Sequence, residues 1–339
     1  MEPTLDRIKE ITAAGKHIIA WQGVRIVAPE EWEPGAFSGD WGGGYIRLDE
    51  RLAPRLVIRW LPEDSTDKLF RKASSRAEAI KQVADNYLAS LEKSQTKKRN
   101  DLVHERADRL LPRRSLDVSP ASFFRWRSKG RRETVYGVGF AGECPTSGRI
   151  LLCECTGEDE EENQRSAAEL LSTLRPYPQS DEAVLWSTFG LRFVLPKEWT
   201  LAGSKLTGGR IEFRFKRDDD SQVVVQRWIA NLSLRRGDLV AWAKKQLATD
   251  LRREFQFRME RGRCLGHDAV LAEGTIRAAK ERVVHSTRKF LKIETPFHLV
   301  SRAWHCEPEN KIFVVRAVCK ESEKEFADEI VARFVCHVE

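Results

Sequence analysis

Short segments in which apolar and polar residues alternate occur in two series along this chain. Alternation predicts strands that bury one face, and the predicted strands are 45–48, 56–60 and 150–155 in the first series and 211–215, 223–228 and 312–319 in the second. Helical spacing predicts helices over 77–91 and 239–251, and acidic residues begin two closing helices over 160–174 and 323–335. An amphipathic pattern that stops at Gly15 predicts a further helix within residues 1–16.

The two series are related by a direct sequence match. Residues 23–32, Gly-Val-Arg-Ile-Val-Ala-Pro-Glu-Glu-Trp, are identical at six of ten positions to residues 190–199, Gly-Leu-Arg-Phe-Val-Leu-Pro-Lys-Glu-Trp. Paired glycines, two hairpin strands, a helix, later strands and a closing helix follow each match in the same order. We therefore predict an internal duplication, with four tryptophans in equivalent core positions: Trp32, Trp60, Trp199 and Trp228.

The predicted organisation is an N-terminal helix over 1–16, a first repeat over 17–178 and a second repeat over 183–339. Pro176 and Pro178 lie between the repeats, where they end the preceding helix and stiffen the connection. The expected fold class is α+β, and each repeat is expected to be a mainly antiparallel sheet flanked by helices. Two related domains on a short linker are also expected to pack as a pseudo-dimer.

Parts of the second repeat resemble the Mog1/PsbP-like fold. These parts are residues 193–199, Phe-Val-Leu-Pro-Lys-Glu-Trp, and the tail in which Trp304-His305-Cys306 is followed by Ile312-Phe313-Val314-Val315 and a closing helix. The resemblance extends over nearly all of 183–339 and is weaker over 17–178, where 96–122 have no clear counterpart. It implies an antiparallel sheet flanked by helices, and a protein-binding or accessory role without a catalytic centre.

The net charge of +7 is concentrated in one stretch of the first repeat. Residues 93–132, treated as a basic insertion, hold thirteen Lys and Arg against four Asp and Glu. Cations neutralise phosphates and aromatic rings stack on bases, so Phe123, Phe124 and Trp126 among the charges predict a nucleic-acid surface. An acidic protein surface would suit the same charges, and a solvated helix end with an Arg-rich hairpin explains them without a partner. The predicted contacts are Lys97, Lys98, Arg99, Arg113, Arg114, Arg125, Arg127, Lys129, Arg131 and Arg132.

The second repeat holds cysteines and histidines with the chemistry of a zinc site. Zn²⁺ prefers thiolate and imidazole ligands in a tetrahedron of four. Cys264 lies near His267, His305 precedes Cys306, and Cys336 and His337 are adjacent near the C-terminus. The predicted metal ligands are His267, Cys306, Cys336 and His337, provided that the fold brings them together. Buried cysteines with unrelated surface histidines are the alternative.

Other motifs lack the context that their chemistry requires. Residues 137–142 match the G-x-G-x-x-G pattern of dinucleotide-binding proteins, but a strand follows them where a helix should begin. The sequence contains neither a G-x-S-x-G nor an H-E-x-x-H motif. We therefore predict no catalytic residue and no cofactor other than zinc.

The chain is expected to be cytoplasmic with free cysteines. No run of about 18 apolar residues is present, and the N-terminal residues do not form a signal peptide. Exported proteins are the ones that usually form disulfides. The expected function is that of a non-catalytic protein that binds a partner protein without inserting into a membrane, and the alternatives are nucleic-acid binding and metal binding.

Overall fold

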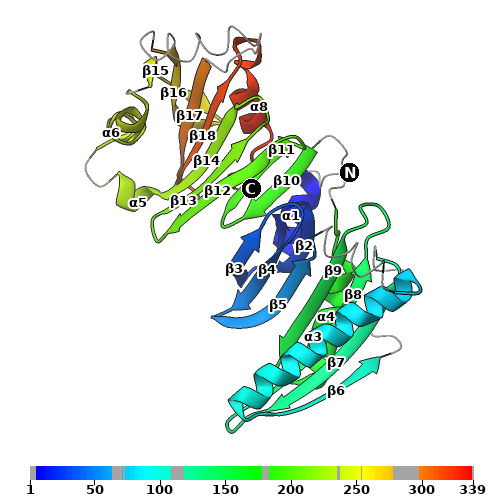
Figure 1. The fold of residues 1–339 in the computed structure, drawn as a ribbon. Coiled ribbons are helices and arrows are strands. Elements are labelled where there is room, and N and C mark those ends of the chain that lie inside the picture. The colour runs from blue at the N-terminus through cyan, green and yellow to red at the C-terminus, as the bar shows by residue number, and fades with distance from the viewer. Residues whose placement is uncertain are drawn as a thin grey trace. The chain divides into compact units, whose positions relative to one another are not determined.

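The computed structural model describes residues 5–62, 71, 73–107, 118–177, 183–234, 237–252, 254–277 and 298–337 (Figure 1). The chain divides into two compact units. The first comprises Met1–Asp181 and Leu185–Thr188, and the second comprises Glu182–Val184 and Phe189–Glu339. Leu185–Thr188 therefore lies with the first unit, although the sequence assigned it to the second repeat. The reason is strand pairing, because Ser187 lies opposite Ala20.

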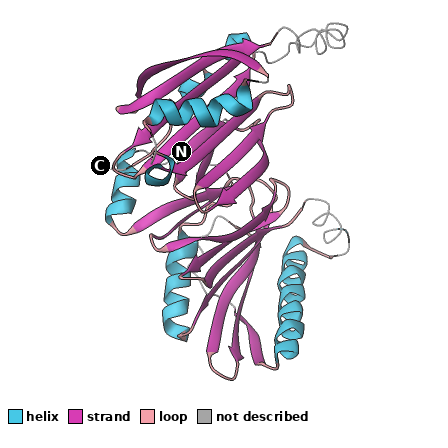
Figure 2. Ribbon diagram, turned by 90° about the vertical axis from the view of Figure 1, so that its left-hand side faces the viewer, coloured by secondary structure: helices cyan, strands magenta, loops and turns pink. Residues whose placement is uncertain are grey.

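The first unit is built around an antiparallel sheet of seven strands. It begins with α1 (Leu5–Ala13) and the hairpin of β1 (Lys16–Trp21) and β2 (Val24–Pro29). The sheet strands are β3 (Trp32–Gly39), β4 (Gly44–Glu50), β5 (Ala53–Trp60), β6 (Asp101–Ala107), β7 (Ala121–Lys129), β8 (Thr134–Glu143) and β9 (Ile150–Gly157), in the order β3-β4-β5-β9-β8-β7-β6. Two helices, α3 (Arg76–Lys98) and α4 (Glu160–Ser172), pack on opposite faces of this sheet (Figure 2).

The second unit contains another antiparallel sheet of seven strands. Along the chain, the strands of this sheet come after β10 (Ala183–Thr188) and β11 (Leu191–Pro196). The sheet strands are β12 (Thr200–Thr207), β13 (Arg210–Lys216), β14 (Gln222–Ile229), β15 (Phe255–Cys264), β16 (His267–Ile276), β17 (His298–Cys306) and β18 (Lys311–Cys319), in the order β12-β13-β14-β18-β17-β16-β15. The helices are α5 (Ala230–Ser233), α6 (Leu239–Leu251) and α8 (Phe326–Ala332).

The two seven-stranded sheets share one strand order. Along each sheet β3 corresponds to β12, β6 to β15 and β9 to β18, and a helical segment follows both the third and the last strand of each series. Each unit is thus a mainly antiparallel sheet with helices, which confirms the predicted α+β fold class. No helix in the described ranges is both long enough and apolar enough to cross a bilayer.

The described parts of the basic stretch, 93–107 and 118–132, belong to the helix and sheet of this unit rather than to an insertion. They supply the end of α3 and the strands β6 and β7, which occupy the places of β15 and β16 in the other sheet. Along β7 the side chains of Phe124, Trp126 and Ser128 are buried while Arg125, between the first two, is exposed. The charged residues on the exposed face of β7 make this alternation difficult to recognise in the sequence.

Three of the four equivalent tryptophans lie in the core as predicted. Trp32, Trp60 and Trp199 are exposed by 8%, 1% and 3%. Trp228 is only partly buried, and its ring makes an edge contact with Trp242 of α6 at a centroid distance of 5.5 Å. Trp228 therefore lies at the border between the core and a surface groove.

The glycines of the G-x-G-x-x-G pattern lie within β8 and are explained by packing. A Cβ at Gly137 would lie 2.0 Å from the Trp126 ring, and one at Gly139 would lie 2.2 Å from a backbone carbonyl oxygen. Trp126 is the cross-strand neighbour of Gly137, and Phe124 is that of Gly139. The two aromatic rings thus cover the space that the missing side chains leave, and no helix N-terminus follows to bind a phosphate.

The closing helix of the second unit is shorter than the sequence predicts. It spans Phe326–Ala332, after a 3₁₀ turn over Glu321–Glu323, whereas the predicted helix covers 323–335. Arg333 leaves the helical conformation, with φ −104° and ψ 12°, and the Phe334 side chain turns into the core. Cys336 and His337 therefore follow the helix in an irregular segment instead of ending it.

Candidate metal centre

Two of the predicted ligands lie at the ends of adjacent strands. His267 is the first residue of β16 and Cys306 is the last residue of β17. These strands are antiparallel, and Ala269 lies opposite Trp304. When this register is continued by two residues, His267 lies opposite Cys306 on the same face of the sheet, because side chains two residues apart share a face.

The other two ligands lie in the segment that follows α8. Phe334 anchors this segment, since its ring packs edge-on against Trp304 at 4.9 Å between centroids. The N–H of Val335 donates to the Arg192 carbonyl oxygen over 3.0 Å. Trp304 precedes Cys306 by two positions on β17, so these contacts carry residues 336–337 to the strand end where the first two ligands lie.

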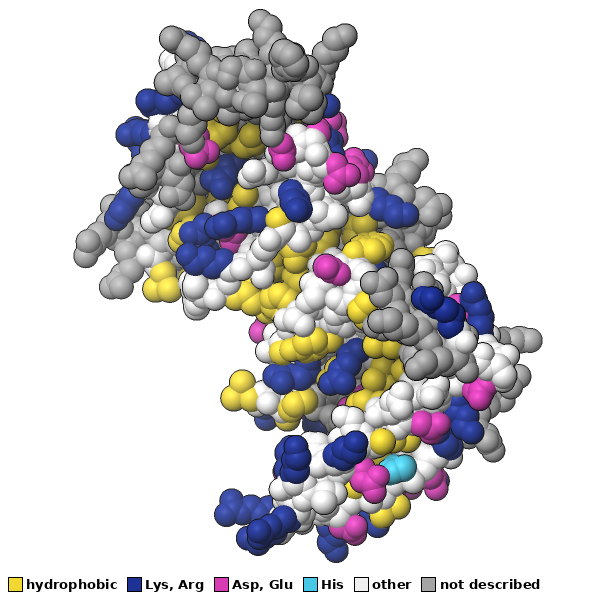
Figure 3. Space-filling model, viewed as in Figure 1, with side chains coloured by type: hydrophobic (Ala, Val, Ile, Leu, Met, Phe, Trp, Pro, Cys, Tyr) yellow, Lys and Arg dark blue, Asp and Glu magenta, His cyan; other side chains and the backbone are white. Residues whose placement is uncertain are grey.

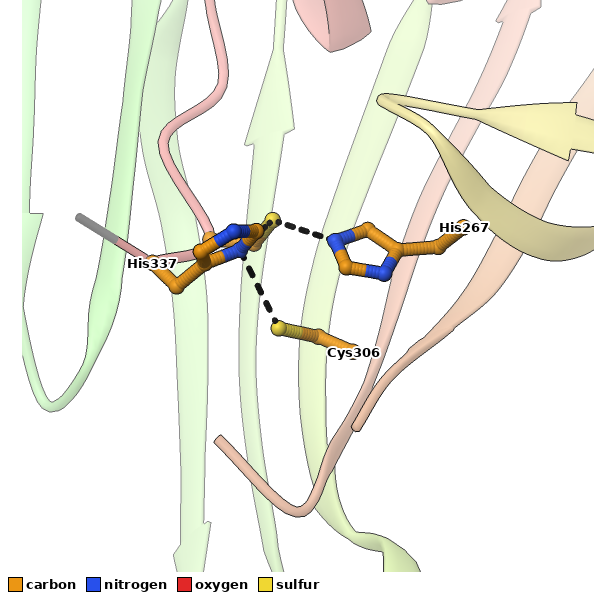
Figure 4. Close-up of side chains that lie close together, drawn as sticks. His267, Cys306 and His337 are labelled. Atoms are coloured by element: carbon orange, nitrogen blue, oxygen red, sulfur yellow. Dashed lines mark hydrogen bonds between the residues drawn. The ribbon is translucent and has the colours of Figure 1, made fainter. Parts of the chain in front are cut away.

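The four side chains converge on one point (Figure 4). The ligand atoms of His267, Cys306, Cys336 and His337 all lie within 4.8 Å of one another. Nε2 of His267 is 3.4 Å from Sγ of Cys336, and Nδ1 of His337 is 3.3 Å from the same sulfur and 3.5 Å from Sγ of Cys306. The structure therefore brings together every residue of the predicted metal set.

These separations match the edges of a zinc tetrahedron. Bonds of about 2.3 Å to sulfur and about 2.0 Å to nitrogen at the tetrahedral angle set a ligand nitrogen about 3.5 Å from a ligand sulfur. The recorded nitrogen–sulfur distances are 3.3, 3.4 and 3.5 Å. Pairwise hydrogen bonds account for the cluster less well. An imidazole nitrogen carries one proton or one lone pair, whereas Nδ1 of His337 faces two sulfur atoms.

Burial changes the pKa of two of these ligands, Cys306 and His267. It raises the pKa of the Cys306 thiol to about 12, because a buried thiolate lacks solvation. It also lowers the pKa of His267, and the nearby His337 lowers that pKa further. Neutral imidazole is the form that binds metals. A divalent cation would supply the positive charge that the buried Cys306 thiolate requires.

The other five cysteines are buried and lie outside this cluster. Cys144, Cys153 and Cys155 belong to the first unit, and Cys264 and Cys319 belong to the second. Burial raises the pKa of Cys264 and of Cys319 to about 11. They therefore act as small apolar core residues.

The residues predicted to contact nucleic acid fall into three groups. Lys97 and Lys98 end α3, and Arg99 caps it with φ 60°. Arg125, Arg127 and Lys129 are exposed on one face of β7, and Arg131 and Arg132 lie in the turn before β8. Arg113 and Arg114 lie outside the described residues. Cations at a helix C-terminus favour the helix dipole, which gives Lys97 and Lys98 a structural role as well.

Two of the three aromatic rings of this stretch, Phe124 and Trp126, point into the core, and Phe123 is half-buried. Phe124 is fully buried and Trp126 is 7% exposed. Nε1 of Trp126 donates to a Glu154 carboxylate oxygen over 2.6 Å. The prediction that these two rings stack on bases is therefore wrong, because alternation along β7 turns them away from the exposed arginines.

Comparisons with known proteins give structural likenesses only. No family model and no curated protein matches the chain. The solution structure of cyanobacterial PsbP (CyanoP) from Synechocystis sp. PCC 6803 is similar at 13% identity over 47% of this chain and 94% of that chain, with a TM-score of 0.33. A PsbP protein is thus among the similar structures, as the resemblance predicted.

Two further structures are similar over most of this chain. One is the immunity protein TplEi of T6SS from Pseudomonas aeruginosa complexed with an "L" peptide, at 10% identity over 96% of this chain and 99% of that chain, with a TM-score of 0.35. The other is the Tle4–Tli4 complex, at 10% identity, 95% and 97% coverage and a TM-score of 0.33. Identities at this level bear on the fold alone.

Proposed function

We propose that this chain is a non-catalytic zinc-binding protein, in which Zn²⁺ is held by His267, Cys306, Cys336 and His337. The observation that supports this proposal is the convergence of two sulfur and two nitrogen atoms within 4.8 Å of one another. Two thiolates with two imidazoles are the ligand set of many structural zinc sites. Magnesium and calcium prefer oxygen ligands, and the cluster offers none.

Four protein ligands leave no open position on a tetrahedral ion. A catalytic zinc ion usually has three protein ligands and a water, so a closed site favours a structural role. The bound ion would join the end of β16, the end of β17 and the segment after α8. We therefore propose that zinc fixes the C-terminal segment against the sheet of the second unit.

The test is metal analysis of the full chain, purified without a tag. Wild type is expected to carry one equivalent of zinc, and Cys306→Ser and His337→Gln less than a tenth of an equivalent. His305→Gln is the matched control, because His305 neighbours Cys306 but lies outside the cluster. Wild type that neither contains zinc nor binds it at micromolar concentration would refute the proposal.

Thermal unfolding gives a second measure of the same site. A ligand present at 100 times its Kd stabilises the native state by about 2.7 kcal/mol. For a domain of about 150–250 residues this raises Tm by about 5–11 °C. Zinc should produce this shift in metal-free wild type and in His305→Gln, but not in His337→Gln.

We also propose that the chain binds a partner protein, through a groove in the second unit. The groove has a volume of about 860 Å³ between α6 and the β12–β14 side of the sheet, and its lining includes Lys205, Arg210, Trp228 and Leu232. Leu232 is 58% exposed, and the Arg210 guanidinium lies 4.6 Å from the centroid of the Trp228 ring. Aromatic residues and arginine carry much of the energy of protein interfaces. Cations around apolar side chains suit an acidic segment that also presents an aromatic ring.

A random copolymer of glutamate and tyrosine is a suitable probe for this groove. It should bind more tightly than polyglutamate in fluorescence titrations. Leu232→Asp should weaken binding at least tenfold, and Leu206→Asp, on an exposed leucine that does not line the groove, should not. Equal loss in both variants, or no preference for the copolymer, would refute the proposed groove.

A further inference from the structure

Two basic segments meet at one end of the sheet in the first unit. The Gln95 side-chain oxygen of α3 accepts hydrogen bonds from Ser128 Oγ over 3.1 Å and from Asn100 Nδ2 over 2.9 Å. Ser128 precedes the β7–β8 turn, and Asn100 follows the end of α3. Gln95 therefore fixes the helix end beside the turn, and the residues that we call the basic tip lie there: Lys97, Lys98, Arg99, Lys129, Arg131 and Arg132.

The six cations of the basic tip are exposed, and two acidic residues lie near them: Asp101 is opposite Lys129, and Glu133 follows Arg132. No ion pair is recorded for any of them within the part of the chain that the structure describes. Two arginines of the neighbouring strands differ, because Arg106 pairs with Asp85 and Arg125 pairs with Glu105. Lys and Arg side chains gather where α3, β6 and β7 end at the lower left of Figure 3. Unpaired like charges held close together create a positive potential that attracts polyanions.

The basic tip lacks the features that suit a protein partner or single-stranded nucleic acid. A protein interface needs an apolar or aromatic centre, and single strands bind by stacking on aromatic rings. Of the three aromatic residues in the adjacent strand, Phe124 and Trp126 are buried and Phe123 is half-buried. A cation-rich surface fits a phosphate backbone, which is recognised through charge without base contacts.

We infer that the basic tip binds the sugar–phosphate backbone of double-stranded nucleic acid without sequence preference. Each cation that neutralises a phosphate adds about 0.9 to the slope of log K against log salt, so six cations predict a slope of up to about −5. This inference is independent of the zinc proposal, because the basic tip and the metal ligands lie in different units.

Fluorescence anisotropy with a labelled 24-base-pair DNA duplex, measured over a salt series, tests the inference. Lys97→Glu/Lys98→Glu/Arg99→Glu should weaken binding at least tenfold at low salt and reduce the slope by about 3. The glutamine version of this triple variant should give a smaller loss while leaving the end of α3 folded. Lys197→Glu/Lys216→Glu/Lys324→Glu is the control, since it changes the net charge equally on exposed lysines of the second unit that do not line the groove.

Salt-dependent duplex binding that the tip variants lose and the control keeps would support the inference. Absence of binding at micromolar protein and low salt would overturn it. Equal loss in the control would overturn it too, because the effect would then follow net charge and not the basic tip. Tighter binding to single strands, or equal binding to polyglutamate, would assign the tip to base stacking or to an acidic protein instead.

Discussion

The glycines of β8 allow a direct test of whether the G-x-G-x-x-G pattern serves packing or ligand binding. Alanine at Gly137 would place its Cβ 2.0 Å from Trp126 Cε2, and alanine at Gly139 would place it 2.2 Å from the Cys153 carbonyl oxygen. Alanine at Gly142 would meet a Val118 methyl group at 3.1 Å. The first two contacts lie far inside van der Waals distance and involve a buried ring and the backbone. The third needs a shift of only a few tenths of an ångström.

The size of each effect follows from two opposing terms. Alanine in place of a strand glycine gains about 0.5–1 kcal/mol of backbone entropy, whereas overpacking a core costs about 1–3 kcal/mol. We expect Gly137→Ala and Gly139→Ala to lose a net 2 kcal/mol or so, and the two terms to nearly cancel in Gly142→Ala. At about 2–4 °C per kcal/mol for a domain of this size, the first two variants should lower Tm by about 4–8 °C.

Differential scanning calorimetry of the three single variants measures these shifts. Gly137→Ala should also be partly rescued by Trp126→Leu, which removes the ring that the new methyl group strikes. If Gly137→Ala melts within about 1 °C of wild type, or if Gly142→Ala is the least stable of the three, the packing explanation is wrong. A dinucleotide-binding loop would instead keep its stability in all three variants.

Three further predictions concern buried charge and thiol exposure. Burial raises the pKa of the Glu154 carboxyl above its ordinary 4.5. Between the unfolded and the native pKa, native protein therefore binds more protons than unfolded protein, and its stability falls as the pH rises through that range. In urea unfolding, Glu154→Gln should be more stable than wild type at pH 7 and equal to it near pH 4. The Asp328 carboxylate accepts two 2.7 Å hydrogen bonds from the buried Arg302 guanidinium. Asp328→Asn should therefore lower the free energy of unfolding by about 1–2 kcal/mol, whereas Glu329→Gln, at an exposed neighbouring position, should lower it by under about 0.5 kcal/mol. Similar losses in both variants would contradict this prediction. Cys336 alone among the seven cysteines is not fully buried. Iodoacetamide should therefore label Cys336 first in metal-free protein, and peptide mass spectrometry would identify the labelled residue. Earlier labelling of any other cysteine would count against the structure of this site.

The fold class could be predicted from the sequence because strand alternation and the match of 23–32 with 190–199 are local patterns. The strand order could not, since it depends on pairings between distant segments such as β5 with β9. Residues 93–132 show the limit most clearly. Their charges lie on the exposed face of β7 and hide the buried alternation of Phe124, Trp126 and Ser128, so the sequence indicated an insertion where the structure has two sheet strands.

The candidate metal centre was accessible to sequence reasoning in its chemistry but not in its geometry. The residue types, two cysteines and two histidines, predicted zinc as the ion. Their convergence depends on the register of β16 with β17 and on the burial of Phe334, which the sequence does not show. The basic tip shows the same division. The sequence identified its cations, but the hydrogen bonds of Gln95 that join the two segments follow no local motif.

The closing segments of the two units differ at the place where the predicted metal ligands lie in the second unit. α4 has 13 residues and buries Ala167, Leu170 and Leu171 as well as Asn163, whereas α8 has 7 residues and buries three small or medium side chains. Both helices thus bury one alanine and two larger aliphatic side chains, so apolar burial by the helix does not distinguish the two units. The difference lies after the helix, where Phe334 and the convergent side chains follow α8, and a bound metal ion would attach that segment to the sheet.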